Sequence, residues 1–330
     1  MRYEQLGVGV LNVDNIIGPG AQTEMGIGQK WYADYTNGSN GNSGKTAGTS
    51  LKTVNAGYSA MVETQNDTLF CLPGTPSVLS EDLTWAKDFT HLVGLGGPAV
   101  ESDHWVEGVT ITSDWTGTAS VITLDITGHR NQFYNVNIQQ PQAAAAAVTA
   151  CRVSSYGNYF KNVHFCGMMT DTQDTGTASS SLEMYTYSGF SIFEDCIIGT
   201  SLYDTRSAVN GQILFSNTDI SKLPQDILFK GCRILNRSAT ATNPAVYLKA
   251  NNAMDRLLEF RDCTFYNFWV DPSDILTSGV IKDACGTSHL ILLSGSTCQY
   301  GWTDWADVHT YVFAAMPTSS ATGGTAIVTS

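Results

Sequence analysis

The densest group of side chains able to do chemistry lies between residues 98 and 117. It combines carboxylates with indole rings, and its members are Glu101, Asp103, Trp105, Glu107, Asp114 and Trp115. Two facing carboxylates hydrolyse a glycosidic bond as acid and base, or as acid and nucleophile, and indole faces stack on apolar surfaces such as those of sugars. The segment is therefore a possible glycan site. The simpler interpretation, which we favour, is an acidic surface loop whose tryptophans pack on the body or on a neighbouring subunit.

A second group offers oxygen atoms to a cation, in and beside a loop rich in Asn, Gly and Ser at residues 36–48. Its candidate ligands are Asp34, Asn37, Ser39, Asn40 and Asn42. Calcium sites usually collect several carboxylates, whereas this set holds one. The composition favours an ordinary turn-rich loop, and we predict neither a metal site nor a cofactor for this chain.

A short phrase that recurs along the chain indicates which elements position these residues. The phrase begins with phenylalanine and has a turn-prone residue third, Val or Cys fourth, and an apolar residue sixth. Its five copies begin at Phe133, Phe160, Phe193, Phe229 and Phe260. The steps between them are 27, 33, 36 and 31 residues. An irregular period of this size is typical of a solenoid of stacked coils.

The positions of the phrase have a physical explanation. Its apolar positions alternate with polar ones as in a strand. The third position holds Asn, Asp or Gly, which tolerate a left-handed backbone, so a sharp bend is predicted between two short strands. A further apolar position lies nine residues before the phenylalanine, at Leu124, Cys151, Met184 and Ile220. We therefore predict an all-β chain that forms a single-stranded right-handed parallel β-helix.

The repeat also accounts for three of the eight cysteines. Cys196, Cys232 and Cys263 occupy the fourth position, where Val136 and Val163 stand in the other copies. A position shared by Val and Cys is a small inward-facing core site. The chain contains no C-x-x-C pair, and its His and Cys residues show no zinc-like spacing. We predict reduced, buried thiols, which suit folding in a reducing cytoplasm.

The two ends differ from the repeating body, which is expected to span residues 29–310. Residues 1–28 lack strong periodicity and contain two Gly-rich turns, so they are predicted to form an extended arm. A helix is expected near residues 50–62, with Ser50 as its N-cap and Leu51, Val54, Tyr58 and Met61 on one face. Residues 311–330 form a predicted C-terminal tail that ends in small residues.

The start of the predicted body resembles a known family. The segment WYADYTNGSNGNSG at 31–44, the short amphipathic helix, and DTLFCLPGT at 67–75 together resemble the N-terminal start of pectin-lyase-like β-helix proteins. The resemblance extends from Lys30 to about Gly301. It implies that the helix closes the open end of the apolar core. It does not fix a function, because this scaffold carries lyases, hydrolases, phage tailspikes and phage capsid proteins.

Polygalacturonase-like members of that superfamily use an Asn-Thr-Asp tripeptide, which occurs here as Asn217-Thr218-Asp219. Their Asp-Asp, Gly-His-Gly and Arg-Ile-Lys partners are absent from this sequence. The tripeptide also falls inside the segment 215–220, FSNTDI, which matches the repeated phrase. We therefore interpret it as a structural copy of the phrase, name no catalytic residue, and expect no enzyme.

Charge and composition narrow the possible partners. The net charge is −13, with 17 Lys and Arg residues scattered along the chain. Nucleic-acid binders usually carry a basic patch, so neither nucleic acid nor an anionic membrane is an expected partner. The first residues lack the basic and apolar regions of a signal peptide, and no apolar run of 18 residues predicts a membrane span.

The predicted function follows from the arm and the closed body. Such an arm suits docking on a larger assembly and ordering on contact, which leads us to predict a structural virion protein of a tailed phage. It would be a capsid decoration (cement) protein, a homotrimer bound to the major capsid protein on the outer surface of the head. The contact is expected at the apolar arm residues Leu6, Val8, Val10, Leu11, Val13, Ile16 and Ile17. The alternative is a tailspike or fibre protein that binds host surface polysaccharide, or binds and depolymerises it.

Overall fold

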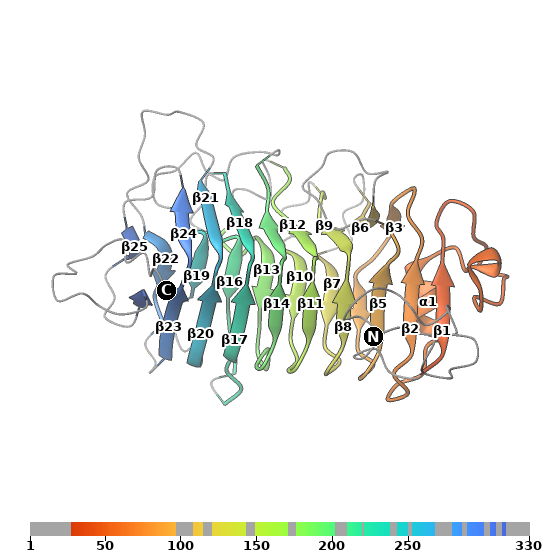
Figure 1. Cartoon of the computed structure of the whole chain (residues 1–330), viewed down its shortest axis with the longest axis horizontal. Coiled ribbons are helices and arrows are strands. Elements are labelled where there is room, and N and C mark those ends of the chain that lie inside the picture. The colour runs from red at the N-terminus through yellow and green to blue at the C-terminus, as the bar shows by residue number, and fades with distance from the viewer. Residues whose placement is uncertain are drawn as a thin grey trace, which may run out of the picture.

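The chain winds into an elongated stack of coils around one apolar core (Figure 1). The computed structural model describes residues 28–96, 108–114, 121–142, 149–170, 176–201, 210–219, 221–237, 243–249, 253–267, 279–285, 289–299, 304–307 and 312–314. These residues form three parallel sheets, which we call A, B and C. Each complete coil passes from sheet C through A to B, so the predicted parallel β-helix is confirmed. Among the described residues, no helix is long and apolar enough to cross a bilayer.

Sheet A contains the start of each repeated phrase and runs along the whole stack. Its strands are β1 (Lys30–Ala33), β2 (Thr68–Cys71), β5 (His91–Gly94), β8 (Gln132–Tyr134), β11 (Tyr159–Lys161), β14 (Ile192–Glu194), β17 (Gln225–Lys230), β20 (Asp255–Arg261), β23 (His289–Ser294) and β26 (Val312–Ala314). The last strand pairs with β23 and continues the sheet beyond residue 310, where the sequence placed the end of the body.

Sheet B follows sheet A after the bend in each phrase. Its strands are β3 (Ser77–Leu79), β6 (Val109–Ser113), β9 (Val136–Gln139), β12 (His164–Cys166), β15 (Ile197–Gly199), β18 (Arg233–Asn236), β21 (Thr264–Asn267) and β24 (Thr297–Gln299). Sheet C contains β4 (Leu83–Trp85), β7 (Ile122–Ile126), β10 (Thr149–Val153), β13 (Ser180–Met184), β16 (Ile213–Phe215), β19 (Val246–Leu248), β22 (Gly279–Asp283) and β25 (Asp304–Asp307).

The phenylalanines that begin the phrase form a continuous column inside sheet A. Phe133, Phe160, Phe193, Phe229 and Phe260 are all fully buried. Their rings stack with centroid distances of 4.6 to 5.0 Å and interplanar angles of 2 to 14°. Strand register continues the column through Leu69 and Leu92 on one side and Leu293 on the other. The repeated phenylalanine therefore marks the centre of the core.

The bend after each phenylalanine strand has the left-handed backbone that the sequence predicted. Asn135, Asn162, Asp195, Gly231 and Asp262 have φ values between 53 and 64°. The Asn162 side-chain amide donates a hydrogen bond of 2.9 Å to the Asn135 side-chain oxygen one coil away. Residues that accept this conformation at low cost thus turn the chain from sheet A into sheet B.

A column of thiols follows the bend. The Sγ atoms of Cys196, Cys232 and Cys263 each contact the phenylalanine carbonyl of the preceding coil, at 3.4 to 3.6 Å. Ser296 continues the pattern with its hydroxyl on the Phe260 carbonyl at 3.0 Å. Burial raises the pKa of the Cys232 and Cys263 thiols well above the ordinary value, so both remain protonated donors. All eight cysteines are free, and seven are buried.

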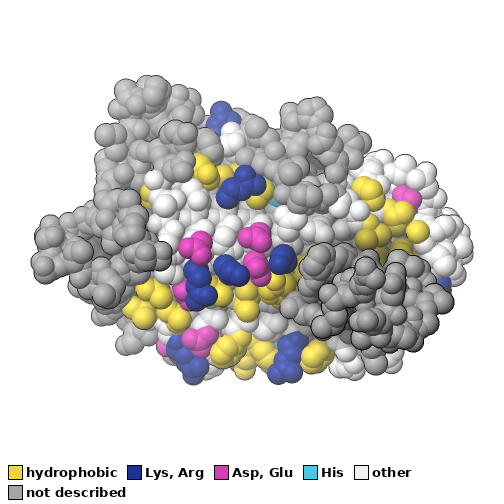
Figure 2. All heavy atoms as spheres, viewed as in Figure 1, with side chains coloured by type: hydrophobic (Ala, Val, Ile, Leu, Met, Phe, Trp, Pro, Cys, Tyr) yellow, Lys and Arg dark blue, Asp and Glu magenta, His cyan; other side chains and the backbone are white. Residues whose placement is uncertain are grey.

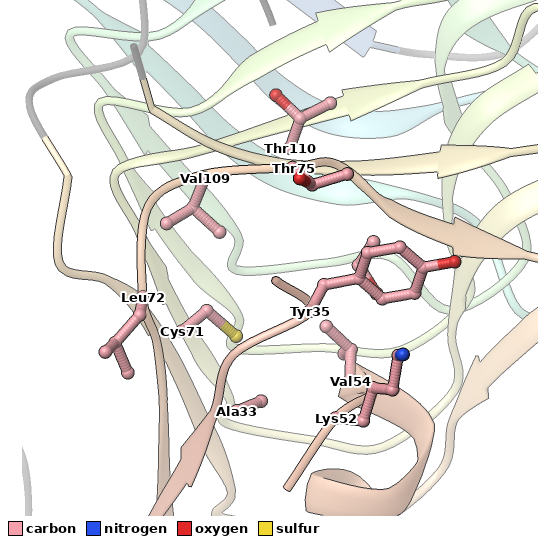
Figure 3. Close-up of a pocket in the computed structure, with 10 residues that line it drawn as sticks. Ala33, Tyr35, Lys52, Val54, Cys71, Leu72, Thr75, Val109 and Thr110 are labelled. Atoms are coloured by element: carbon pink, nitrogen blue, oxygen red, sulfur yellow. The ribbon is translucent and has the colours of Figure 1, made fainter. Parts of the chain in front are cut away.

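A short helix packs on the first strands of sheet A. Helix α1 spans Val54–Ala60, preceded by the 3₁₀ turn η3 (Ala47–Thr49), and contacts β1 and β2. Its N-cap is Thr53, whose hydroxyl accepts the Ala56 amide hydrogen at 3.1 Å, so the prediction of Ser50 was wrong. A narrow pocket beside Val54, Cys71 and Val109 encloses about 10 Å³ (Figure 3), which is room for about one water molecule.

Two other details of the sequence interpretation were wrong. Phe215 lies in sheet C, paired with Met184 and Leu248, so the segment 215–220 is not a sixth copy of the phrase. In sheet C, Leu182 rather than Met184 is the partner of Cys151. The segment from Leu182 to Phe193 is two residues longer than the segment from Cys151 to Phe160. Counting nine residues back from Phe193 therefore gives Met184 instead of the true equivalent, Leu182.

Candidate functional site

Most of the residues predicted to bind a glycan or to dock on a partner lie outside the described part of the chain. This holds for Glu101, Asp103, Trp105, Glu107 and Trp115, and for all the apolar arm residues from Leu6 to Ile17. Asp114 is described and follows β6, where its backbone amide donates a hydrogen bond of 3.0 Å to the Leu79 carbonyl. The glycan hypothesis for 98–117 and the docking hypothesis for the arm both remain predictions.

The oxygen-rich loop near Asp34 uses its side chains for local turns. The Asp34 carboxylate accepts the backbone amides of Thr36 and Asn37, each at 2.9 Å. The Asn40 side-chain oxygen accepts the amides of Lys52 and Thr53 at 2.9 and 3.2 Å. These bonds are those of a turn-rich loop, as the composition predicted, and they hold the chain that leads into α1.

The Asn217-Thr218-Asp219 tripeptide forms a hydrogen-bonded turn after β16. The Asn217 side-chain oxygen accepts the Asp219 amide at 2.9 Å, and its side-chain NH₂ donates to the Asp219 carbonyl at 2.7 Å. The Ser221 hydroxyl and amide donate to the Asp219 carboxylate, which lowers the pKa of Asp219. The carboxylate is held ionised, which suits a turn anchor rather than a general acid.

A hollow lined by tyrosines lies where the chain turns from sheet C into sheet A. We call it the tyrosine groove; it is about 290 Å³ in volume. Its principal lining residues are Tyr156, Tyr187, Ser221, Lys222, Gln225 and Asp255. They come from four successive coils, so the groove runs along the stack. Hydrophobic side chains are interspersed with basic and acidic ones along the corresponding lower edge of the molecule (Figure 2).

The backbone of the turns fixes these side chains in place. The Tyr187 amide donates to the Lys222 carbonyl at 3.0 Å, and the Phe190 amide donates to the Gln225 carbonyl at 2.9 Å. Tyr187 and Phe190 both have positive φ values, 72 and 55°. A Cβ atom at Gly189 would lie 2.8 Å from the Gln225 side chain. The turns therefore stack closely, and Tyr187 projects outward with 44% of its surface exposed.

Neighbouring contacts extend the polar and aromatic character of this edge. The His129 and Tyr156 rings stack at a centroid distance of 4.1 Å. The Lys222 ammonium lies 5.2 Å from the centre of the Tyr187 ring. A groove that combines aromatic faces with hydroxyl, amide, ammonium and carboxylate groups can stack on a ligand and hydrogen-bond its edges. That chemistry suits a polyhydroxylated polymer.

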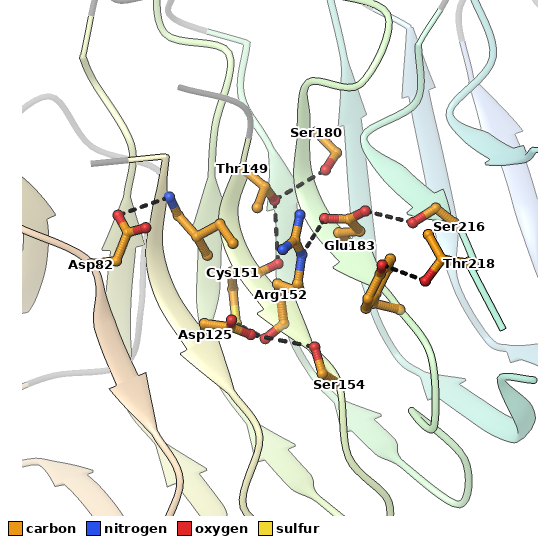
Figure 4. Close-up of polar contacts among 12 residues, drawn as sticks. Asp82, Asp125, Thr149, Cys151, Arg152, Ser154, Ser180, Glu183, Ser216 and Thr218 are labelled. Carbon is orange, nitrogen blue, oxygen red and sulfur yellow. Dashed lines mark hydrogen bonds and ion pairs between the residues drawn. The ribbon is translucent and has the colours of Figure 1, made fainter. Parts of the chain in front are cut away.

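A row of charged residues lies on the outer face of sheet C. Asp125, Arg152 and Glu183 occupy the same row on β7, β10 and β13 (Figure 4). The Arg152 Nε lies 2.7 Å from Glu183 Oε2, and the Ser216 hydroxyl donates to Glu183 Oε1 at 2.5 Å. Burial raises the pKa of Asp125, against the opposing effect of Arg152. Both Glu183 oxygens are engaged, so the row is better suited to holding three strands together than to acid–base chemistry.

One cluster brings a buried cysteine next to two other residues that can ligate a metal. Asp283, Cys285 and His289 are all buried, and their possible ligand atoms lie within 4.8 Å of one another. In the sequence the three residues have the spacing D-x-C-x₃-H, which is not among the cysteine and histidine spacings typical of zinc sites.

Comparison with known proteins supports the fold. No family model matches the sequence, and no curated protein does. Among solved structures, pectate lyase Pel9A is similar with a TM-score of 0.51 and 12% identity, covering 83% of this chain and 64% of that one. A mutant pectin methylesterase in complex with a hexasaccharide has a TM-score of 0.49 and 15% identity, covering 79% of each chain.

A third similar structure is the pectin methylesterase PemA from Erwinia chrysanthemi, with a TM-score of 0.44 and 14% identity over 86% of this chain and 92% of that one. At these identities the likeness concerns the fold. The three parallel sheets and the likeness to pectate lyase Pel9A give the chain the architecture of the right-handed parallel β-helix proteins.

Proposed function

We propose that this chain binds a polysaccharide and that the tyrosine groove is the binding surface. The observation that carries the proposal is the convergence of Tyr156 and Tyr187, from successive turns, on one open hollow with polar groups at its margin. This is the polysaccharide-binding alternative of the sequence analysis, with a different set of residues from the segment 98–117.

The charge of the protein indicates which polymer to expect. A net charge of −13 repels polyanions at low ionic strength, and Asp255 lies in the groove itself. The expected ligand is therefore a neutral polysaccharide, with the single Lys222 ammonium placed to donate hydrogen bonds to hydroxyl oxygens. Binding requires no catalytic step, in keeping with the expectation of no enzyme.

The test is affinity electrophoresis of the full chain through gels that contain dextran, laminarin, galactomannan or polygalacturonate. At least one neutral polymer should retard the protein more than polygalacturonate does. Tyr187→Ala should weaken that retardation about tenfold, which corresponds to the loss of about 1.4 kcal/mol of binding free energy.

Tyr247→Ala is the matched control. Tyr247 is also an outward tyrosine beside a lysine, with Lys282 Nζ 5.3 Å from its ring centre, but it lies on sheet C away from the groove residues. If no polymer retards the protein, or if both variants lose retardation equally, the groove is not the binding surface.

A second candidate function is the decoration of a phage capsid by a homotrimer. One feature of the surface supports it. Apolar side chains lie exposed on the outer face of sheet A and its adjoining turn: Phe190 is 51%, Ile192 38% and Leu290 39% exposed. Hydrophobic side chains are visible over the lower ends of β20 and β23 (Figure 2). Strand register places Ile192 in line with Leu228, Glu259 and Leu292, and Leu290 in line with Leu257. The exposed apolar residues therefore lie on neighbouring rows of one face, and a second copy packed side by side about a parallel symmetry axis would cover them.

The measurement for this candidate is the mass of the protein in solution. Ile192→Lys should convert a trimer to monomers, whereas Val78→Lys, at a position 38% exposed on β3, should not. A wild-type monomer would remove the support of the exposed apolar residues. In this proposal the major capsid protein is the partner and the outer capsid surface the location, and removal of residues 1–28 abolishes attachment to heads without dissociating the trimer.

A further inference from the structure

The cluster of Asp283, Cys285 and His289 interrupts an otherwise apolar column of the core. Strand register in sheet C aligns Asp283 with six inward-facing residues of the other coils, namely Trp85, Ile126, Val153, Met184, Phe215 and Leu248. All six are buried hydrophobic residues. Asp283 is 2% exposed. An ionisable group at such a position is costly unless other groups satisfy it.

The contacts of Asp283 form a built site around its two oxygens. Oδ1 accepts the backbone amide of Cys285 at 2.9 Å, which fixes the turn after β22. Oδ2 lies 2.7 Å from Nε2 of His289, the first residue of β23. The side chains of Asp283 and His289 are both fully buried. The carboxylate therefore joins the end of a strand in sheet C to the start of the next strand in sheet A.

Asp283 and His289 form a hydrogen-bonded pair, and the third member of the cluster, Cys285, donates a long hydrogen bond of 3.7 Å from its Sγ to the Met254 carbonyl. Cys285 is 4% exposed, and the possible ligand atoms of all three residues lie within 4.8 Å of one another. Carboxylate, thiolate and imidazole are the donors that zinc takes in proteins, at about 2.0–2.3 Å. Tetrahedral geometry at these lengths separates donors by roughly 3.3–3.8 Å, so shifts of about an ångström bring the three into a common coordination sphere.

We propose that Asp283, Cys285 and His289 bind a zinc ion that ties β22 to β23 inside the core. The thiolate selects against magnesium and calcium, which prefer oxygen donors. The Cys285 amide, which donates to Asp283 Oδ1, orients the carboxylate as an outer-shell partner. Zinc binding neutralises a carboxylate and a thiolate in an apolar surrounding, and its role is structural. The site is independent of the tyrosine groove and of the proposed polysaccharide binding.

The first test uses the wild-type full chain and requires no variant. The protein is stripped with a chelator and titrated with Co²⁺, a spectroscopic substitute for zinc. One equivalent of Co²⁺ should produce a thiolate-to-cobalt charge-transfer band and visible absorption typical of tetrahedral coordination. One equivalent of Zn²⁺ should abolish both. A spectrum without the thiolate band would overturn the proposal even if cobalt binds elsewhere.

The second test measures thermal stability with and without Zn²⁺. At a free zinc concentration 100 times the dissociation constant, the Tm of the wild type should rise by about 5–10 °C. Cys285→Ser and His289→Gln should lose the rise. Cys298→Ser is the control because Cys298 is a partly exposed thiol outside the cluster, and it should keep the full rise. If Cys298→Ser loses the rise as well, zinc acts on thiols in general and not on the cluster. If the Tm of the wild type does not rise, zinc does not stabilise the fold, and either outcome would overturn the proposal.

Discussion

The phenylalanine column repeats one residue type from coil to coil, whereas the edge formed by the turns from sheet C into sheet A, which we call the turn edge, varies. Inside sheet A, five successive coils place the same side chain at the same point, and each ring is fully buried. At the turns from sheet C into sheet A, four successive coils present side chains of three chemical kinds, with tyrosine in two coils, Tyr156 and Tyr187, and then Lys222 and Asp255. The interior repeats because each coil must fill the same space, whereas the edge is free to vary and can therefore acquire a binding function.

The largest loss of stability is expected from a substitution in the phenylalanine column. Phe193 stacks between Phe160 and Phe229 at 4.6 Å on each side, so Phe193→Ala removes contacts with both neighbours and leaves a cavity. Phe→Ala in a core costs about 3–5 kcal/mol of unfolding free energy. Urea denaturation should show this loss. A loss below about 1 kcal/mol would mean that the column does not hold the stack together.

A second prediction concerns His91, which is buried on β5 with both ring nitrogens unpartnered among the described residues. Burial lowers the pKa of His91 to about 4, against the opposing effect of Asp67. The unfolded chain therefore binds more protons than the folded one between about pH 6.5 and pH 4. The unfolding free energy should therefore be highest above pH 6.5, and it should fall by roughly 3 kcal/mol as the pH drops from 6.5 to 4.

The measurement is the unfolding free energy of the wild type and of His91→Leu at pH 7.5 and pH 4.5. The variant should lose less stability on acidification than the wild type. The control is His129→Gln, at the turn edge. It should lose as much unfolding free energy as the wild type between pH 7.5 and pH 4.5. If His91→Leu and the wild type respond identically, another group governs the pH dependence.

A third prediction concerns the bend between the two regions. Asn162→Val places a β-branched residue at a φ of 57° and removes the hydrogen bond to Asn135. We expect a loss of about 2–3 kcal/mol of unfolding free energy. Asn162→Gly keeps the backbone unstrained and loses mainly the hydrogen bond, so it should cost about 1 kcal/mol. Equal losses in the two variants would exclude backbone strain as the cause.

The smallest effect is expected at the edge. Phe190 is 51% exposed, and Phe190→Ala should change the unfolding free energy by less than about 0.5 kcal/mol. Chemical denaturation of this variant beside Phe193→Ala compares the same substitution three residues apart. A loss at Phe190 comparable to that at Phe193 would mean that the turn edge is packed like the interior.

The same contrast explains what the sequence could predict. The phenylalanines, the left-handed residues and the thiols recur because packing and backbone geometry impose them on every coil. Phe215 was misassigned because sheet C also needs large apolar residues in its own inward column, and sequence alone does not distinguish the two columns. The N-cap was placed at Ser50, three residues before the actual cap Thr53, because Ser and Thr are both good N-caps and the sequence pattern alone does not fix the first turn of a helix.

The groove and the Asp283 cluster were beyond prediction for a different reason. Tyr156 and Asp255 are 99 residues apart in the sequence and line the same groove because turns of unequal length place them on it. No periodic pattern therefore relates them. Asp283 is conspicuous when strand register places it in line with Leu248 and Phe215, and that register requires the structure.

The ring stack also determines how the molecule responds to force. Each coil touches its neighbours and little else, so tension applied to the two ends of the chain acts on one junction at a time. Pulling should peel off coils singly, with each step breaking one pair of stacked rings and one set of parallel strand pairings. Adding coils would lengthen the rod without raising the force needed to peel it.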